Sequence, residues 1–283
     1  MIAFLGTGML GSGFVRAFVR RGEQVHVWNR TPEKARALEA IGVRAFDDPA
    51  DAVRGATRVH LTLSDDASVD DVLERARAGL APDVFVVDHT TTSATGSALR
   101  SARWAERGVA FLHAPVFMGP QNALESTGTM LVSGNPAHVA ALEPALSAMT
   151  GKLVHLGETP EAAASFKLLG NLLLMFLTAG FADMLMLAKA LGAPPESAAT
   201  LLDHFNPGAT LPARLRRMVS ARFEEPSWEL GMARKDARLM LEEAARARLD
   251  LHVLPAIAAR MDAVIAEGHA KSDWTVLGKD ALE

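Results

Sequence analysis

A glycine-rich turn near the N-terminus restricts the possible folds of this chain more than any other feature. The apolar run Ile2 to Leu5 leads into Gly6-Thr7-Gly8-Met9-Leu10-Gly11, after which apolar residues recur at helical spacing. A second apolar run, Gln24 to Trp28, follows at the distance expected for a strand–turn–helix–strand unit. Three glycines at this spacing let the backbone turn tightly and approach a pyrophosphate at the start of the helix. The predicted phosphate-binding residues are Gly6, Gly8, Met9 and Leu10.

The end of the second predicted strand indicates which nicotinamide cofactor such a unit would bind. A site for NAD usually has Asp or Glu here to accept hydrogen bonds from the ribose, whereas this chain has Asn29, Arg30 and Thr31. Arg30 can pair with a 2′-phosphate, and the hydroxyl of Thr31 can donate a hydrogen bond to it. NADPH is therefore expected to bind in preference to NADH. Thr31 also fits the cap of a helix that has Pro32 in its first turn.

Apolar and amphipathic segments then alternate along the chain. Strands are expected at 59–63, 84–88 and 109–113, and helices at 66–78 and 93–107. This alternation is typical of the α/β class with a doubly wound parallel sheet, in which ligands bind at the carboxyl ends of the strands. The residues expected at that edge are Leu63, Ser64 and the segment Asp88-His89-Thr90-Thr91.

The rest of the chain divides into the end of this unit and a helical domain. Residues 114–122 do not have the pattern of a helix, and strands at 128–133 and 152–156 flank a helix at 136–149. Beyond residue 157 the sequence contains no convincing strand. We expect a Rossmann domain at 1–157 and an all-α domain at 158–283, with helices at 196–205, 230–248 and 254–269.

Residues 160–192 are expected to form one long helix that begins at the domain junction. From Phe166 to Leu191 there is no proline and apolar side chains point in nearly every direction, so we expect the helix to be buried on all sides. A membrane span is disfavoured because Asn171 and Asp183 interrupt the run, and a carboxylate within lipid costs about 2.5 kcal/mol or more. A long helix at the centre of a helical domain, also able to form a subunit contact, fits better, with Asp183 as a structural partner.

Two polar residues near the start of this helix, Lys167 and Asn171, are four apart and so lie on the same face. By itself, Lys167 could be a side chain that extends its ammonium group from the helix start into water.

Composition excludes several classes of protein. With 283 residues, of which 49% are hydrophobic, the chain can bury a sizeable core. Its net charge of -4 and scattered basic residues do not favour nucleic acid as a partner. Because there is no cysteine, disulfides and thiolate metal sites are excluded, and no other metal site is predicted. The start of the chain has no secretion signal, so a cytoplasmic protein without a membrane span is expected.

The order of motifs resembles the β-hydroxyacid dehydrogenase family, which includes 3-hydroxyisobutyrate dehydrogenases, glyoxylate and succinic semialdehyde reductases, and imine reductases. The family's Asp-x-Ser-Thr motif is matched by Asp88-His89-Thr90-Thr91, and its Asp-Ala-Pro-Val-Ser-Gly-Gly loop by His113-Ala114-Pro115-Val116-Phe117-Met118-Gly119. Its Gly-x-x-x-Lys-x-x-x-Asn helix is matched by Lys167 and Asn171, with Ala163 in place of the glycine. A late Lys-Asp pair is present as Lys235-Asp236.

The resemblance implies roles for these residues. It implies a Rossmann domain, a helical domain and a homodimer that interlocks through the helix at 160–192. It also implies that Lys167 is the catalytic acid/base, that Asn171 holds Lys167 or the substrate oxygen, and that Lys235 approaches the nicotinamide or a substrate carboxylate. The implied substrate-binding residues are Thr91, Phe117, Met118, Gly119, Lys167 and Asn171.

The substrate loop departs from the family pattern. Phe117 and Met118 stand where the family has Ser and Gly, and a Phe side chain cannot donate a hydrogen bond to a substrate carboxylate. The expected function is an NADPH-dependent oxidoreductase that interconverts a small carbonyl compound, either an aldehyde or an oxo acid, and its alcohol. The alternatives are an imine reductase and a non-catalytic cofactor-binding module. Lys167 favours oxygen chemistry, because imine reductases of this family commonly have Asp or Tyr at that position.

Overall fold

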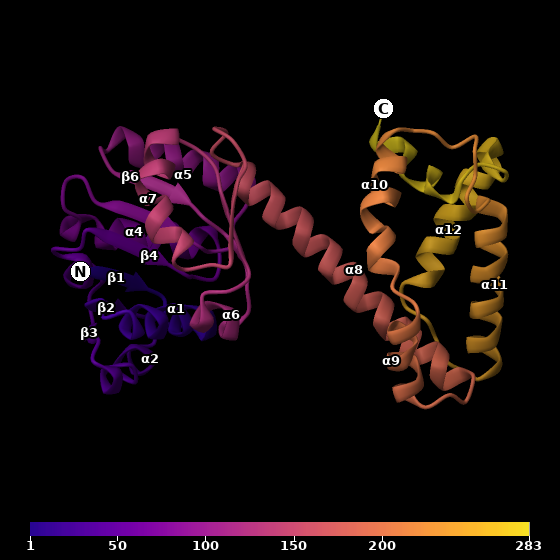
Figure 1. Ribbon diagram of the computed structural model, residues 1–283, viewed down its shortest axis with the longest axis horizontal. Helices are drawn as coiled ribbons and strands as arrows, with labels where there is room; N and C mark the ends of the chain where they lie inside the picture. The colour runs from indigo at the N-terminus through magenta and orange to yellow at the C-terminus, as the bar shows by residue number, and fades with distance from the viewer. Residues whose placement is uncertain (283) are drawn as a thin grey trace. The chain divides into compact units, whose positions relative to one another are not determined.

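The structure is a computed structural model that describes residues 1–282, and its contacts divide the chain into two compact units (Figure 1). The division falls within a long helix, between Leu172 and Leu173, whereas the sequence predicts a boundary after residue 157. The difference arises because the first turns of this helix pack on the first unit, where Ala163 and Ala164 are fully buried.

The first unit is built on a parallel sheet with the order β3-β2-β1-β4-β5-β6. The strands are β1 (Ile2–Leu5), β2 (Val25–Trp28), β3 (Arg44–Phe46), β4 (Arg58–Leu61), β5 (Phe85–Asp88) and β6 (Ala110–His113). Their connecting helices are α1 (Met9–Arg20), α2 (Pro32–Arg36), α3 (Pro49–Val53), α4 (Asp66–Ala76) and α5 (Ala94–Glu106). The predicted doubly wound sheet is confirmed. Strand order reverses between β1 and β4, which is where such sheets bind ligands.

Alternating side chains of β1 belong to two separate cores, one on each face of the sheet. Phe4 packs with Phe14 and Phe18 of α1, whereas Leu5 packs with Leu61 of β4 and Leu73 of α4. All four residues of β1 are buried, as expected for a central strand covered by helices on both faces.

A smaller sheet completes the first unit. It contains β7 (Val116–Phe117), β8 (Thr129–Val132) and β9 (Lys152–His155), with β7 antiparallel to β8 and β8 parallel to β9. Two helices separate these strands, α6 (Pro120–Glu125) and α7 (Pro136–Ser147). The sequence does not predict α6, which begins at Pro120 and is short. Tertiary packing supports it, because a Cβ at Gly13 of α1 would lie only 2.6 Å from the Pro120 carbonyl oxygen.

The long helix α8 (Ala162–Ala190) begins where the sequence predicts but is not buried on all sides within this chain. Its start is held by Ser133, whose hydroxyl accepts the Ala163 N–H at 3.0 Å and donates to the Pro160 carbonyl at 3.1 Å. Farther along, apolar side chains such as Leu169, Met175 and Phe176 are more than half exposed. The helix is long and apolar enough to cross a membrane, but a single helix of this kind is weak evidence for a span.

The second unit consists of helices around a core of its own. After α8 come α9 (Pro195–His204), α10 (Leu211–Val219), α11 (Leu230–Arg246) and α12 (Leu254–Val264), followed by a π-helical turn (Ile265–His269) and a 3-10 segment (Trp274–Ala281). Buried side chains of this core include Leu230, Met261, Val264 and Val276. The predicted helical second half is confirmed, and α10 is the helix that the sequence does not predict.

Asp183 of α8 has the predicted structural role. Its carboxylate accepts hydrogen bonds from the backbone N–H groups of His252, Val253 and Leu254 at 2.7 to 2.9 Å. Burial alone would raise the pKa of Asp183, but these bonds outweigh that effect and hold the pKa below its usual range. The carboxylate therefore stabilises the start of α12 and explains the acidic residue in an apolar helix.

Candidate active site

The three glycines of the first turn are each needed for a different reason. Gly6 has a positive φ of 98°, and a Cβ there would collide with the Thr62 carbonyl oxygen. A Cβ at Gly11 would collide with the Gly6 carbonyl oxygen, so the helix can pack closely on the turn. At Gly8 a Cβ would meet nothing within 4 Å, because this residue faces an open crevice. The turn therefore leaves room beside Gly8 for a ligand to approach the backbone.

The start of α1 fits the pyrophosphate of a dinucleotide. Gly8 is the N-cap, no side chain caps the helix, and its first turn contains no acidic residue. The first N–H groups of the helix, at Met9 and Leu10, are consequently free to donate to an anion. The predicted phosphate-binding residues lie together beside this crevice.

The adenosine end of the crevice is a cavity of about 320 Å³ at the end of β2. Asn29 organises it: its side-chain oxygen accepts the Thr7 N–H at 3.0 Å, and its amide donates to the Thr31 carbonyl at 2.9 Å. Arg30 and Thr31 are exposed and line the cavity, as do Leu63 and Ser64.

Two further cations line the same cavity, Lys34 and Arg75, and neither is among the residues predicted from the sequence. The Arg75 guanidinium lies over the Trp28 ring, 5.2 Å from its centroid, and 3.8 Å from the carboxylate of Asp71. The sequence offers a signal for Lys34, because this residue lies in the first turn of the helix that begins just after Arg30 and Thr31. Arg75 has no local signal, because α4 is brought to β2 by the fold alone. The cavity thus has three cations and one carboxylate, a balance that favours an additional phosphate.

The other end of the crevice is a cavity of about 370 Å³ that shares Gly8, Thr62, Leu63 and Ser64 with the first. Lys167 lies at its end and is only 9% exposed. Burial lowers the pKa of the Lys167 ammonium below its usual range. The remaining lining residues are Met9, Leu10, Gly11, His89, Thr90, Thr91, Val116 and Met118. A buried lysine with a lowered pKa beside the phosphate-binding turn is suited to exchange a proton with a ligand.

The segment after β5 is fixed by its own hydrogen bonds. The Thr90 N–H donates to Asp88 at 2.9 Å, and the Thr90 hydroxyl accepts the Leu63 N–H at 2.9 Å. Asp88 is fully buried, and burial raises its pKa. It lies 4.0 Å from the guanidinium of Arg100 and does not line the crevice, so the expectation that it faces the ligand is wrong. Thr91 is exposed at the crevice, as predicted.

His89 lines the crevice, and both of its ring nitrogens form hydrogen bonds within the protein. Arg58 donates to Nε2 of His60 at 2.8 Å, so His60 donates through Nδ1 to Nε2 of His89 at 2.9 Å. His89 then donates through Nδ1 to the Ala114 carbonyl at 2.7 Å. Burial lowers the pKa of His89 to about 4, so the ring is neutral near pH 7. His89 therefore shapes the cavity and leaves Lys167 as the group able to exchange a proton.

The side chains of Phe117 and Met118 give the substrate loop no donor for a carboxylate. Phe117 has no hydroxyl, and its ring lies beneath the Lys167 ammonium, which is 4.3 Å from the ring centroid. The Gly119 N–H already donates to the side chain of Asn122 at 2.9 Å. Met118 adds an apolar surface to the cavity. The loop therefore presents an apolar wall.

Two predicted residues are outside this group of contacts. Asn171 lies one turn after Lys167 on α8, is partly buried, and its side chain makes no hydrogen bond within residues 1–282. Lys235 belongs to α11 of the second unit, where its ammonium pairs with Asp236 at 2.7 Å. Their predicted contacts with substrate and cofactor stay predictions.

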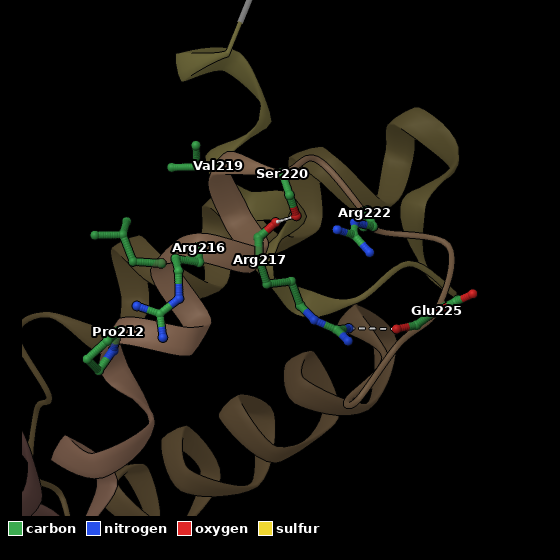
Figure 2. A pocket seen from close by; sticks show the side chains of 8 residues that line it. Pro212, Arg216, Arg217, Val219, Ser220, Arg222 and Glu225 are labelled. Atoms are coloured by element: carbon green, nitrogen blue, oxygen red, sulfur yellow. Dashed lines mark hydrogen bonds between the residues drawn. The ribbon is translucent and has the colours of Figure 1, made fainter.

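A separate cavity of about 750 Å³ lies in the second unit and contains none of the predicted site residues (Figure 2). Its arginines flank apolar side chains of α10, and Arg217 is held by the Glu225 carbonyl at 2.6 Å and Asp273 at 2.9 Å. Its lining contains no lysine or histidine and no glycine turn, so the crevice of the first unit is the better candidate for the active site.

The parallel sheet, its glycine turn and the lysine at the end of the crevice define a dinucleotide-binding oxidoreductase. Residues 1–157 match the family model of the NAD-binding domain of 6-phosphogluconate dehydrogenase. Residues 162–279 match that of the NAD-binding domain of NADP-dependent 3-hydroxyisobutyrate dehydrogenase. The chain belongs to the β-hydroxyacid dehydrogenase family and is an NAD(P)-dependent oxidoreductase.

Individual relatives agree with this assignment. The chain is 25% identical to the oxidoreductase YfjR of Bacillus subtilis over 98% of each chain. It is also 25% identical to 3-sulfolactaldehyde reductase of Escherichia coli, over 98% of this chain and 94% of that protein. The imine reductase of Myxococcus stipitatus, solved with NADP+, has the same fold, with a TM-score of 0.91, 20% identity and 99% of each chain covered.

Proposed function

We propose that the protein is an NADPH-dependent reductase of small carbonyl compounds, in which Lys167 is the acid/base. The observation that supports this most is the position of the Lys167 ammonium, buried in the cavity that also contains the phosphate-binding turn. Bound NADPH supplies a hydride to the carbonyl carbon. The chain must then give a proton to the carbonyl oxygen as its double bond to carbon becomes single, and Lys167 is the group suited to do so.

Imine reduction is the second candidate, and the substrate loop favours it. Phe117 and Met118 have no side-chain donors, the Gly119 N–H is occupied, and the same fold occurs in an imine reductase. A substrate without a carboxylate would fit this wall better than an oxo acid would. Lys167 supports oxygen chemistry instead, because an imine can arrive already protonated and does not need a strong acid.

Oxidation of NADPH in the presence of small aldehydes, oxo acids and cyclic imines separates these functions. We expect the highest kcat/KM with an aldehyde that lacks a carboxylate. Turnover of cyclic imines alone would contradict carbonyl reduction and support the second candidate. Tight NADPH binding with no turnover across all three classes would support a non-catalytic module.

Arg30 is proposed to select NADPH over NADH, and replacing it should remove most of that preference. A charge-assisted contact with the 2′-phosphate contributes about 1.5 to 3 kcal/mol, or about 10- to 100-fold in affinity. Arg30→Ala should raise the Kd for NADPH by that factor and leave the Kd for NADH unchanged, as measured by calorimetry.

Arg36→Ala is the matched control, because Arg36 lies on α2, pairs with Asp47 at 2.6 Å and does not line the cavity. It should leave both Kd values unchanged. Equal wild-type affinity for the two cofactors would contradict the proposed preference.

We further propose that the protein is a cytoplasmic homodimer whose contact includes α8. The support is the row of exposed apolar side chains on this helix, which a soluble protein rarely leaves in water. A second copy of the chain, with the same helix, would provide an equally apolar surface to cover it.

A further inference from the structure

The residues around the Lys167 ammonium include an aromatic ring but no carboxylate. The Phe117 ring lies 4.3 Å, measured to its centroid, from Nζ of Lys167. Within residues 1–282, no acidic side chain forms an ion pair with Lys167, although the residue is only 9% exposed. The negative face of the ring is thus the local feature that attracts the ammonium.

The ring is held at this place by Gly170. A Cβ on Gly170 would collide with Cζ of Phe117, and the next two ring atoms are also close. Gly170 follows Lys167 by three residues on α8, so the glycine and the lysine lie on the same face of the helix. The ring therefore lies directly on the helix backbone beside the lysine, and any other residue at position 170 would displace it.

The other end of Phe117 is fixed by the small sheet. Phe117 is in β7 and is paired with Thr129 of β8, so its backbone does not depend on α8. The ring is thus fixed from one side by β7 and from the other by the helix. A ring fixed in this way can hold the flexible lysine side chain in one place.

We propose that Phe117 is a positioning residue that holds the Lys167 ammonium over its ring at the end of the crevice, and that Gly170 makes this contact possible. The family has a serine hydroxyl at position 117, whereas this chain has an aromatic ring there that faces the ammonium of Lys167. This inference rests on the proposed role of Lys167, but the contact itself can be tested without turnover.

The contact has a measurable consequence for protonation. Burial disfavours the ammonium, and the ring face favours it, so removing the ring should lower the pKa of Lys167 further. His89 is the other titratable side chain that lines this cavity, and it is neutral near pH 7 because burial lowers its pKa to about 4. A pKa measured near or above pH 7 for a group in this cavity would therefore belong to Lys167.

Phe117→Leu is the first test, because it keeps an apolar side chain and removes the aromatic face. The basic limb of the pH profile of kcat should move to lower pH by about 0.5 to 1.5 pH units. On that limb kcat should fall by about 3- to 30-fold, because the reduction needs the protonated lysine.

A trifluorinated phenylalanine at position 117 distinguishes the electrostatic attraction between the ring and the ammonium from the effect of packing alone. Fluorine withdraws electron density from the ring face with little change in volume, so the limb should move in the same direction as in Phe117→Leu. A side chain that only filled space would give no movement. This variant also retains the packing if Phe117→Leu proves too unstable to study.

Gly170→Ala provides the coupling test. It should move the limb in the wild-type background, because the new methyl group displaces the ring, but hardly at all in the Phe117→Leu background, where the colliding ring atoms are absent. Additive effects of the two substitutions would contradict the proposed contact.

Acylation of Lys167, followed by peptide mass spectrometry, measures the same pKa without catalysis. Only the neutral amine reacts, so the midpoint of the pH dependence of labelling should fall in Phe117→Leu and in the fluorinated protein. If the wild type reduces no carbonyl compound but this midpoint moves, the proposed function fails and the contact stands. If turnover is normal and neither the midpoint nor the limb moves in the fluorinated protein, the contact is overturned.

Discussion

Lys167→Ala is expected to lower kcat for the best carbonyl substrate by about 10² to 10⁴-fold, the usual contribution of a general acid. Hydride addition places negative charge on the carbonyl oxygen, and the alanine variant has no group in this cavity to neutralise it. His89 cannot replace the lysine, because both of its ring nitrogens are engaged and its pKa is about 4. The Kd for NADPH should be nearly unchanged, since the phosphate-binding turn and Arg30 are untouched.

Three further variants define the chemistry. Lys167→Arg should not restore kcat, because a guanidinium hardly releases its proton near neutral pH. Asn171→Ala should cost less than Lys167→Ala, because it removes a neighbour of the acid and not the acid itself. Lys152→Ala, at an exposed lysine of β9, is the control and should have no effect.

Single-turnover measurement of NADPH oxidation gives the chemical step directly. If Lys167→Ala retained near-full turnover on carbonyl substrates, the proton would have to come from elsewhere. Imine reduction, with a substrate that arrives protonated, would then be the better explanation.

Phe176→Asp is expected to weaken the proposed dimer by about 3 to 5 kcal/mol, the usual cost of an uncompensated buried charge. Phe176 is 58% exposed within this chain, and its neighbours Leu173, Leu174 and Met175 are at least half exposed. If a second copy covers this face, the carboxylate loses its water on association and finds apolar side chains instead. The dissociation constant should therefore rise by more than 100-fold.

Leu99→Asp is the matched control, because Leu99 is 60% exposed and lies on α5 and not on α8. It should leave association unchanged. Sedimentation velocity over a range of concentrations distinguishes these outcomes. A wild-type protein that is folded and monomeric at micromolar concentration would contradict association through α8.

Local patterns in the sequence determine the order of the elements and the identity of several site residues. The glycine turn is predictable from the spacing of its glycines in the sequence. The structure explains this spacing, because only glycine fits the close contacts at positions 6 and 11. Most strands and helices of the first unit follow from the period and length of apolar runs, but β3, α3 and α6 do not. Lys167 and Asn171 are visible as two polar residues four apart on an apolar helix, whereas the role of Lys167 as the acid is implied by the family resemblance.

Other features depend on residues that are distant in the sequence. Arg75 of α4 lines the adenosine end only because the fold places its guanidinium over Trp28 of β2. Phe117 of β7 meets Lys167 of α8 in the same way. The sequence analysis does not predict α3, α6 and α10, which are short, so packing on neighbouring elements supplies much of their stability.

The exposure of α8 illustrates the limit best. The apolar composition of α8 shows from the sequence alone that this helix needs an apolar environment. Which surface meets it depends on tertiary structure, and within this chain only the first turns of α8 and scattered positions such as Asp183 are buried. Hydrophobic burial has no direction or fixed partner, so the sequence alone determines that the helix must be covered, and only packing decides where and by what.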